Sequence, residues 1–328
     1  MEFIISELQA GKSVLSYLKN SVGLSSGNIS SLKNIPNGIT VNGAQVTVRY
    51  ILGAGEVLTI KEEDNIDSIN HNIKPVDIPI EIIYEDENLI AVNKPPDMPT
   101  HPSHGHTDDT LANALAYIFL QRHTPFVFRA AGRLDRNTSG VVLISKNRMA
   151  ASQLYGAFTN KQITKRYLAV LSGELPLDGH IITIDDYIKR ESDSIITRTV
   201  CGPEIPGATR AITKYKVLYS GNGITLVDVL PKTGRTHQLR VHFSSIGHPI
   251  FGDELYGKAS LLISRHALHA AAITVPMPLS KQLKTFRAAT PSDMEELFFK
   301  ITGQKTENFT EDLRVDIPQK GSNNANRH

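Results

Sequence analysis

Two long runs of β-favouring residues meet at Gly221-Asn222-Gly223, in the stretch AITKYKVLYSGNGITLVDVLP. Strands joined by so short a glycine-containing turn pair with each other antiparallel. A second such pair, IEIIYEDENLIAVNKP, is expected to turn at residues 85–88, and SGVVLISK is a near-continuous apolar run typical of a buried strand. Helical segments occur between these strands without regular β-α-β alternation. The pattern therefore predicts an α+β domain, with a mixed, largely antiparallel sheet and helices packed on it.

The helices of this domain are expected in three stretches. TLANALAYIFLQR is amphipathic with Thr110 as a possible cap, and NRMAASQLYGAF has helical spacing. THQLRVHFSSIG also has helical spacing and should end at Gly247. KRYLAVLSG is expected to be a strand.

Residues 1–62 are predicted to form a small separate α/β unit of two helices and a hairpin. KSVLSYLKNSVG should be a helix stopped by Gly23, and SGNISSLKN a second helix capped by Ser26 or Asn28. GITVNGAQV contains an Asn-Gly hairpin turn, and VLTIKEED is expected to close the unit as a strand. Residues 63–77 are polar and aperiodic, which indicates a linker. We place the main domain at 78–303 and expect the polar stretch 304–328 to be disordered.

Composition excludes several classes of protein. The chain of 328 residues is 40% hydrophobic and 21% charged, and it contains no apolar run of about 18 residues, so we expect no membrane partner. Its single cysteine, Cys201, excludes an internal disulfide and a cysteine-based zinc cluster. The first ten residues lack the order of a secretory signal, so we expect a cytoplasmic protein. The sequence contains no apolar or aromatic stripe that would have to pack against a partner chain, so we expect a monomer.

Charge is distributed unevenly, although the net charge is only +2. Residues 54–97 hold eleven acidic residues against three lysines, whereas residues 129–166 hold eight lysines and arginines against the single acid Asp135. Such a basic stretch attracts a polyanion, and nucleic acid is the common polyanion of a cytoplasm. A merely solvated basic face is the alternative that charge alone leaves open.

Several common motifs are absent. Gly11-Lys12-Ser13 lacks the upstream glycine of a phosphate-binding loop, and no G-x-G-x-x-G or G-x-S-x-G sequence occurs. The chain has twelve histidines, including the cluster HPSHGH, but none shows metal-like spacing with an acidic residue. We therefore expect no metal site and interpret the histidines as mainly structural.

Three segments remain in which glycine, arginine and hydrogen-bonding groups gather at the ends of expected elements. They are GRLDRNTSG around Asp135, KRYLAV around Tyr167, and KTGRTHQLRVHFSSIGHPIFGDELYG with Arg235 and Arg240.

These segments resemble the RluA-type RNA pseudouridine synthases. VNKPPDMPTHPS resembles the family's first motif, GRLDRNTSGVVLISK its catalytic motif, and KRYLAVLSG the segment that carries its active-site tyrosine. The third segment and RHALHA resemble its C-terminal motifs, so that the resemblance covers about residues 80–302 in the family's order. One departure is Gly132, which stands where the family usually has histidine. Residues 1–62 are similar to the small RNA-binding module of ribosomal small-subunit protein S4.

The resemblance implies isomerisation of uridine to pseudouridine in structured RNA, without a cofactor. It assigns the chemistry to Asp135, as nucleophile on the sugar or as base toward the ribose, and both roles remain open. It assigns stacking on the uracil to Tyr167 and the charge partner of Asp135 to Arg240. Arg133 would fill the space that a flipped-out uridine leaves. Further RNA contacts are expected from basic residues near these motifs: Arg136, Lys165, Arg166 and Arg235.

The sequence indicates the identity of the RNA substrate less directly than it indicates the reaction. The appended RNA-binding module favours ribosomal RNA, specifically that of the large subunit, over transfer RNA. A non-catalytic RNA-binding assembly factor is the alternative function, and a metal-dependent hydrolase built on the histidines is a third.

Overall fold

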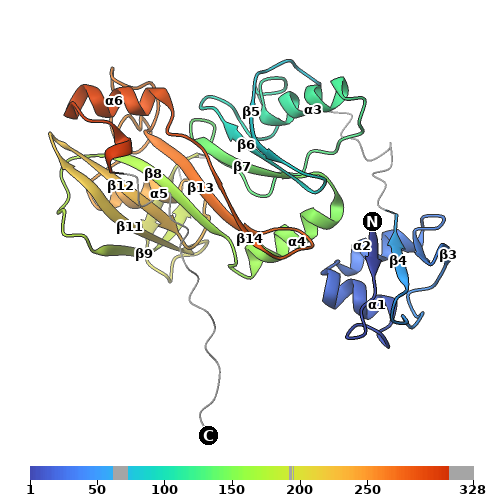
Figure 1. The fold of residues 1–328 in the computed structure, drawn as a ribbon. Helices are drawn as coiled ribbons and strands as arrows, with labels where there is room; N and C mark the ends of the chain where they lie inside the picture. The colour runs from blue at the N-terminus through green and yellow to red at the C-terminus, as the bar shows by residue number, and fades with distance from the viewer. Residues whose placement is uncertain (62–72, 192–193, 195, 310–328) are drawn as a thin grey trace, which may run out of the picture. The chain divides into compact units, whose positions relative to one another are not determined.

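The computed structural model describes residues 1–61, 73–191, 194 and 196–309 (Figure 1). The chain divides into two compact units. Unit 1 contains the described residues of Met1–Lys165 together with Ile273–Ala289. Unit 2 contains the described residues of Arg166–Ala272 and those from Thr290 onward. The chain passes between the units within β8 (Thr164–Ser172), within β13 (Leu268–Pro276) and between Ala289 and Thr290.

The first sixty residues of unit 1 form a four-stranded antiparallel sheet in the order β1-β4-β2-β3, with helical segments on it. The hairpin turns at Asn42-Gly43, both with positive φ, as the Asn-Gly pair predicts. The first helix continues into a π-helical stretch and ends at Gly23 (φ +83°). The second helix is capped by Ser25 instead of Ser26 or Asn28, because the Ser25 hydroxyl accepts the Asn28 N–H. The elements are β1 (Glu2–Ile4), α1 (Val14–Ser16), η1 (Tyr17–Val22), α2 (Ser26–Lys33), β2 (Ile39–Val41), β3 (Ala44–Gln45) and β4 (Val57–Ile60).

This sheet-and-helix module shares contacts with α4 (Arg148–Thr159) of the same unit. Met149 is fully buried and belongs to the module's apolar core. The Gln153 amide donates to the Val22 carbonyl and accepts the Leu279 N–H. The module is therefore fixed to α4 by apolar packing and by a buried amide.

The rest of unit 1 contains the expected hairpin, β5 (Glu81–Glu85) and β6 (Leu89–Lys94), followed in the sheet by β7 (Ser139–Ser145). Every residue of β7 is buried, as its apolar run predicts. Helix α3 (Leu111–Gln121) begins at Thr110 in a capping box with Asn113, which confirms the expected cap. It packs on β6 and β7 through the apolar cluster that includes Leu115. Strand β14 (Leu283–Arg287) pairs with β13.

Unit 2 is built on strands in the order β10-β9-β11-β12-β8, and each neighbouring pair is antiparallel. The hairpin at residues 221–223 joins β11 to β12, as predicted. Helix α5 packs on the sheet through Val241, which meets Ile188 and Ala211. The elements of this unit besides β8 and β13 are β9 (Ile181–Arg190), β10 (Arg198–Cys201), β11 (Thr209–Gly221), β12 (Ile224–Pro231), α5 (Gln238–Ser245), α6 (Ser292–Thr302) and η3 (Thr306–Asn308). The largely antiparallel α+β class is confirmed.

The expected linker and the expected disordered tail lie only partly within the residues that the structure describes. Most of the expected linker lies outside them, as do residues 310–328 of the expected disordered tail. Residues 304–309 are ordered, because the Phe309 ring packs on Tyr219 and Phe298 at 5.3 and 5.8 Å. Across the described ranges, no helix is both long and apolar enough to cross a bilayer.

Candidate active site

Residues 131–138, here called the Asp135 loop, lead directly into β7. The Ala131 N–H donates to the Leu143 carbonyl at 2.7 Å, and the Thr138 N–H donates to the Asp135 carbonyl at 3.0 Å. Gly132 has φ +98°, in the region that favours glycine. Thr138 is buried, so the loop is closed by a tight turn against the start of a buried strand.

The backbone on both sides of Asp135 is held by side chains from the segment 94–100. The ammonium of Lys94, which is 0% exposed, donates to the carbonyls of Pro95 and Met98 at 2.8 Å and of Arg136 at 3.0 Å. The Thr100 hydroxyl donates to the Leu134 carbonyl at 3.3 Å. The carbonyl groups before and after Asp135 therefore have fixed positions, which restricts where its carboxyl group can lie.

Arg136 forms an ion pair at the surface of this loop. Its guanidinium lies 2.6 Å from an Asp97 carboxylate oxygen and 3.3 Å from Nε2 of His106. His106 in turn contacts Asp109 through Nδ1 at 2.6 Å. These side chains are largely exposed, so the pairing adds little stability. Binding of Arg136 to RNA stays a prediction.

Arg133 is exposed and lies near His101. Burial first, and the Arg133 charge second, lower the pKa of His101 below its usual value. The His101 ring meets Phe128 edge-on, with centroids 5.0 Å apart. The Arg133 guanidinium therefore lies close enough to the His101 ring to disfavour its protonation.

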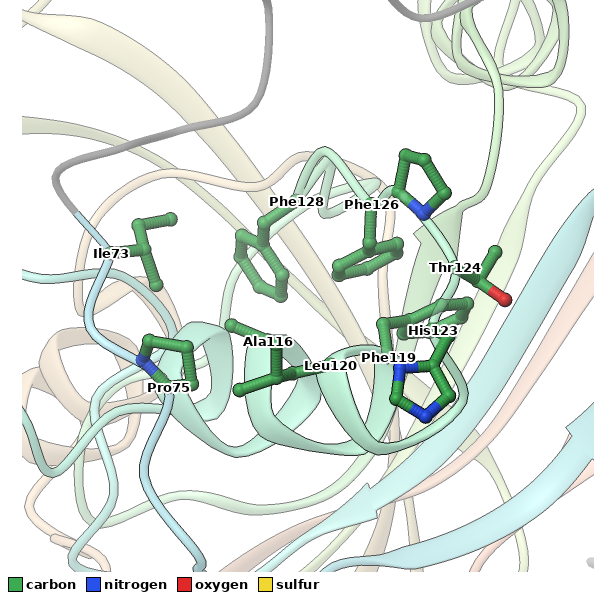
Figure 2. A pocket seen from close by; sticks show the side chains of 10 residues that line it. Ile73, Pro75, Ala116, Phe119, Leu120, His123, Thr124, Phe126 and Phe128 are labelled. Carbon is green, nitrogen blue, oxygen red and sulfur yellow. The ribbon is translucent and has the colours of Figure 1, made fainter. Parts of the chain in front are cut away.

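Phe128 also lines an apolar pocket of about 390 Å³ beside α3, shown in Figure 2. The rings of Phe119 and Phe126 stack there at 4.0 Å. His123 is the one titratable side chain in its lining, which is otherwise apolar except for Thr124. The pocket contains none of the expected catalytic residues, and it lacks a pair of groups for acid–base chemistry. Among the residues described, no cluster of His, Cys, Asp and Glu is arranged to hold a metal ion.

Lys165 lies near Gly132, close to the start of the Asp135 loop. Its ammonium is 5.0 Å from the centroid of the Phe158 ring, and a Cβ built on Gly132 would lie 3.6 Å from its Nζ. Burial lowers the pKa of this ammonium.

In unit 2, Arg240 lies within α5 as predicted, and its guanidinium is buried. It donates to both carboxylate oxygens of Asp253 at 2.7 Å and stacks over the Tyr256 ring at 5.0 Å. The Asp253 carboxylate also accepts the backbone N–H groups of Leu255 and Tyr256. Burial raises the pKa of Asp253, but the hydrogen bonds and charge of Arg240, together with the Leu255 N–H, hold it below its usual value. The resemblance had implied Arg240 as the charge partner of Asp135, whereas the bidentate pairing with Asp253 was not expected from the sequence.

Two histidines, His266 and His237, lie near the Arg240–Asp253 ion pair. His266 is buried, and its pKa falls to about 3, because burial and the Arg240 charge both disfavour the protonated ring. His237 contacts the Tyr256 hydroxyl through Nδ1 at 2.9 Å. The structural role expected for the histidines stays a prediction.

Arg166 and Tyr167 enter β8 with different surroundings. The Arg166 guanidinium is bidentate to Asp228 of β12, at 2.8–3.0 Å, and both side chains are largely buried. Tyr167 is 8% exposed and pairs with Val229 in the sheet register. Arg235 is exposed, three residues before α5, and donates to the Arg210 carbonyl at 3.2 Å. RNA contacts of Arg166 and Arg235, and the stacking role of Tyr167, stay predictions.

The expected site residues are divided between the units. Unit 1 contains Asp135 with three of the expected RNA-binding residues, Arg133, Arg136 and Lys165. Unit 2 contains Arg166, Tyr167, Arg235 and Arg240. Assembly of Asp135, Tyr167 and Arg240 into one catalytic site remains a prediction.

Sequence reasoning missed three side chains that shape this region. Lys94 ends the apolar stretch LIAVNK, and nothing in the sequence marked its ammonium as buried. Asp253 and Asp228 gave no local signal, because their arginine partners lie 13 and 62 residues away.

Comparisons with known proteins identify the family of this chain. The family model described as RNA pseudouridylate synthase matches residues 88–245. A Bacillus subtilis protein, the uncharacterized RNA pseudouridine synthase YjbO, is 35% identical over 84% of this chain and 95% of its own length. Ribosomal large subunit pseudouridine synthase D of Zymomonas mobilis is 37% identical over 70% of this chain and 74% of its own. The solved structure of human RNA pseudouridylate synthase domain containing 1 has a TM-score of 0.57 at 28% identity, covering 73% of this chain and 96% of the human one.

The fold and these relatives together define an enzyme that modifies RNA. The chain belongs to the RNA pseudouridine synthase family, and it is an enzyme of that kind.

Proposed function

We propose that this enzyme converts specific uridines of large-subunit ribosomal RNA to pseudouridine, with Asp135 as the essential carboxylate. The observation that carries the proposal is the Asp135 loop, whose carbonyls before and after Asp135 are both fixed by hydrogen bonds from Lys94 and Thr100. The relative from Zymomonas mobilis, named for the large ribosomal subunit, supports the choice of RNA.

The reaction needs no redox partner and no transferred group. The bond from C1′ of the ribose to N1 of uracil breaks, and a bond from C1′ to C5 forms. The C5 proton is lost and N1 gains one, so that atoms and charge balance. Asp135 acts either by attacking C1′ or by removing a ribose proton, and a fixed loop suits both because each needs the carboxylate at one place.

The target base must first leave its stack in the folded RNA, which costs about a few kcal/mol. Arg133 is exposed in the same loop, two residues before Asp135. Its planar guanidinium can stack on neighbouring bases and hydrogen-bond to phosphate, which a lysine cannot do in the same way. We therefore assign to Arg133 the role of filling the vacated space, and to Tyr167 stacking on the uracil.

The test compares Asp135→Asn with a matched control, Asp108→Asn, which changes an exposed carboxylate of the same unit. Each variant is incubated with ribosomal RNA from cells that lack the gene, and tritium release from C5-labelled uridine is measured. Asp135→Asn should release no tritium above background while it still binds the RNA, and Asp108→Asn should match the unmodified protein. Full activity of Asp135→Asn would overturn the proposed mechanism.

Mapping pseudouridines in all cellular RNA, with and without the gene, tests the substrate. Sites lost only from large-subunit ribosomal RNA would agree with the proposal, whereas sites lost from transfer RNA would contradict it. Loss of no site, with a growth defect that Asp135→Asn rescues, would favour an assembly factor instead.

A further inference from the structure

Lys165 is a half-buried lysine at the second position of β8, in contact with aromatic and apolar groups. Its ammonium lies over the Phe158 ring of α4 at 5.0 Å. Phe158, like Ala131 and Ile163, is partly buried and packs against an apolar cluster. The charged head of Lys165 is thus held by its surroundings near one end of the Asp135 loop.

Gly132 leaves one side of this ammonium uncovered. A Cβ at residue 132 would lie 3.6 Å from Nζ of Lys165 and 3.7 Å from Cζ of Phe158, so a larger side chain there would lie across the ammonium. Gly132 is itself exposed and stands three residues before Asp135.

Within the residues that the structure describes, the Lys165 ammonium takes part in no hydrogen bond and no ion pair. Two neighbouring arginines differ, because Arg136 pairs with Asp97 and Arg166 with Asp228. A cation removed from water without an anionic partner is destabilised, as the lowered pKa of Lys165 also indicates. Such a group gains the most from an anion that a ligand brings.

We propose that Lys165 binds a phosphate group of the RNA, at the open side of Gly132, and so forms a phosphodiester subsite beside the Asp135 loop. The inference rests on the proposed function and specifies what Lys165 recognises. A lysine ammonium offers three donors and a compact charge but no acceptor, which suits a phosphate better than the edge of a neutral base. Phosphate contacts fix the register of a nucleic acid without reading its sequence. Lys165 therefore positions the backbone of the substrate relative to the loop.

The first experiment measures acylation of individual lysines by mass spectrometry, with uridine 5′-monophosphate or uridine as the probe. The monophosphate should protect Lys165, uridine at the same concentration should not, and exposed Lys161 should respond to neither. Equal protection by both probes would show a contact with the base or sugar and overturn the proposal. Protection by neither would show that Lys165 has only its contact with Phe158.

The second experiment measures the binding of a 12-residue oligouridylate at several salt concentrations. Lys165→Met should reduce the slope of log K against log salt by about 0.7, the value for one phosphate contact on a single strand. Lys165→Arg should keep the slope, and Lys161→Met, the same change at an exposed lysine four residues earlier, should lower it less. An unchanged slope in Lys165→Met that still melts like the parent protein would overturn the proposal.

Tritium release by the unmodified protein distinguishes a failure of the phosphate subsite from a failure of the proposed function. If it modifies ribosomal RNA and Lys165→Met keeps the full salt slope, only the phosphate subsite is wrong. If it modifies no RNA, the proposed function is wrong whatever Lys165 binds.

Discussion

The ammonium of Lys94 donates a 3.0 Å hydrogen bond to the carbonyl of Arg136, the residue that follows Asp135. Lys94 ends β6, and Arg136 lies 42 residues later in a loop with no regular structure of its own. A buried ammonium thus connects strand β6 to the Asp135 loop.

Lys94→Met should destabilise the protein by about 1–3 kcal/mol, because the buried hydrogen bond to the Met98 carbonyl loses its donor and an unsatisfied buried group costs about that much. Urea unfolding checks the value. Lys74→Met, the same change at an exposed lysine, should shift stability by less than about 0.5 kcal/mol. Equal stability of the two variants would contradict the structural role of Lys94.

Gly132→Ala and Gly156→Ala should change stability in opposite directions. Gly132 has φ +98°, so alanine there is strained and should cost about 1 kcal/mol. Gly156 lies inside α4 with no atom within 4 Å of an added Cβ, so alanine there should gain up to about 1 kcal/mol. Thermal melting of both variants measures the signs, and a stabilised Gly132→Ala would count against the backbone described for the Asp135 loop.

Arg240→Met should destabilise the protein by about 3–5 kcal/mol, because it leaves the fully buried Asp253 carboxylate without its partner. The double variant Arg240→Met, Asp253→Asn should recover most of this loss, since asparagine is neutral and still accepts the backbone N–H groups. Urea unfolding and tritium release are measured on both.

These variants also separate the structural role of Arg240 from its expected catalytic one. If Arg240 assists Asp135, the double variant should be stable yet inactive. A stable and fully active double variant would show that Arg240 serves only to hold Asp253.

His242 should make the protein less stable in acid. Burial lowers its pKa from 6.5 to about 4, against the opposing charges of Asp186 and Asp185. The unfolded chain therefore binds a proton that the folded protein excludes, and stability falls as pH decreases from about 6.5 to about 4. The full loss from this group is about 3 kcal/mol.

His242→Gln should remove that part of the pH dependence, because glutamine does not titrate and can still contact the Thr213 hydroxyl that His242 meets at 2.9 Å. The measurement is the free energy of unfolding at pH 7 and pH 4.5. His180→Gln, at an exposed histidine, serves as the control, and an identical acid loss in both variants would contradict the assignment.

Features governed by neighbouring residues were predictable from the sequence. The hairpin at residues 221–223, the Thr110 cap of α3, the buried run of β7 and the helix that carries Arg240 all formed as expected. Each depends on local backbone preference or on hydrophobic period, which a short stretch of sequence contains. The first helix was less predictable, since its π-helical continuation has no such local signature.

The sequence by itself determined the α+β class, the main elements and the motif around Asp135. Tertiary structure decided which charged groups meet: Arg240 with Asp253, Arg166 with Asp228, and Lys94 with the carbonyls around the Asp135 loop. The physical reason is that an ion pair between distant residues depends on where the sheet brings them, and burial then gives that pair its energetic weight. No local sequence pattern encodes which distant residues the sheet brings together or how deeply the resulting pair is buried.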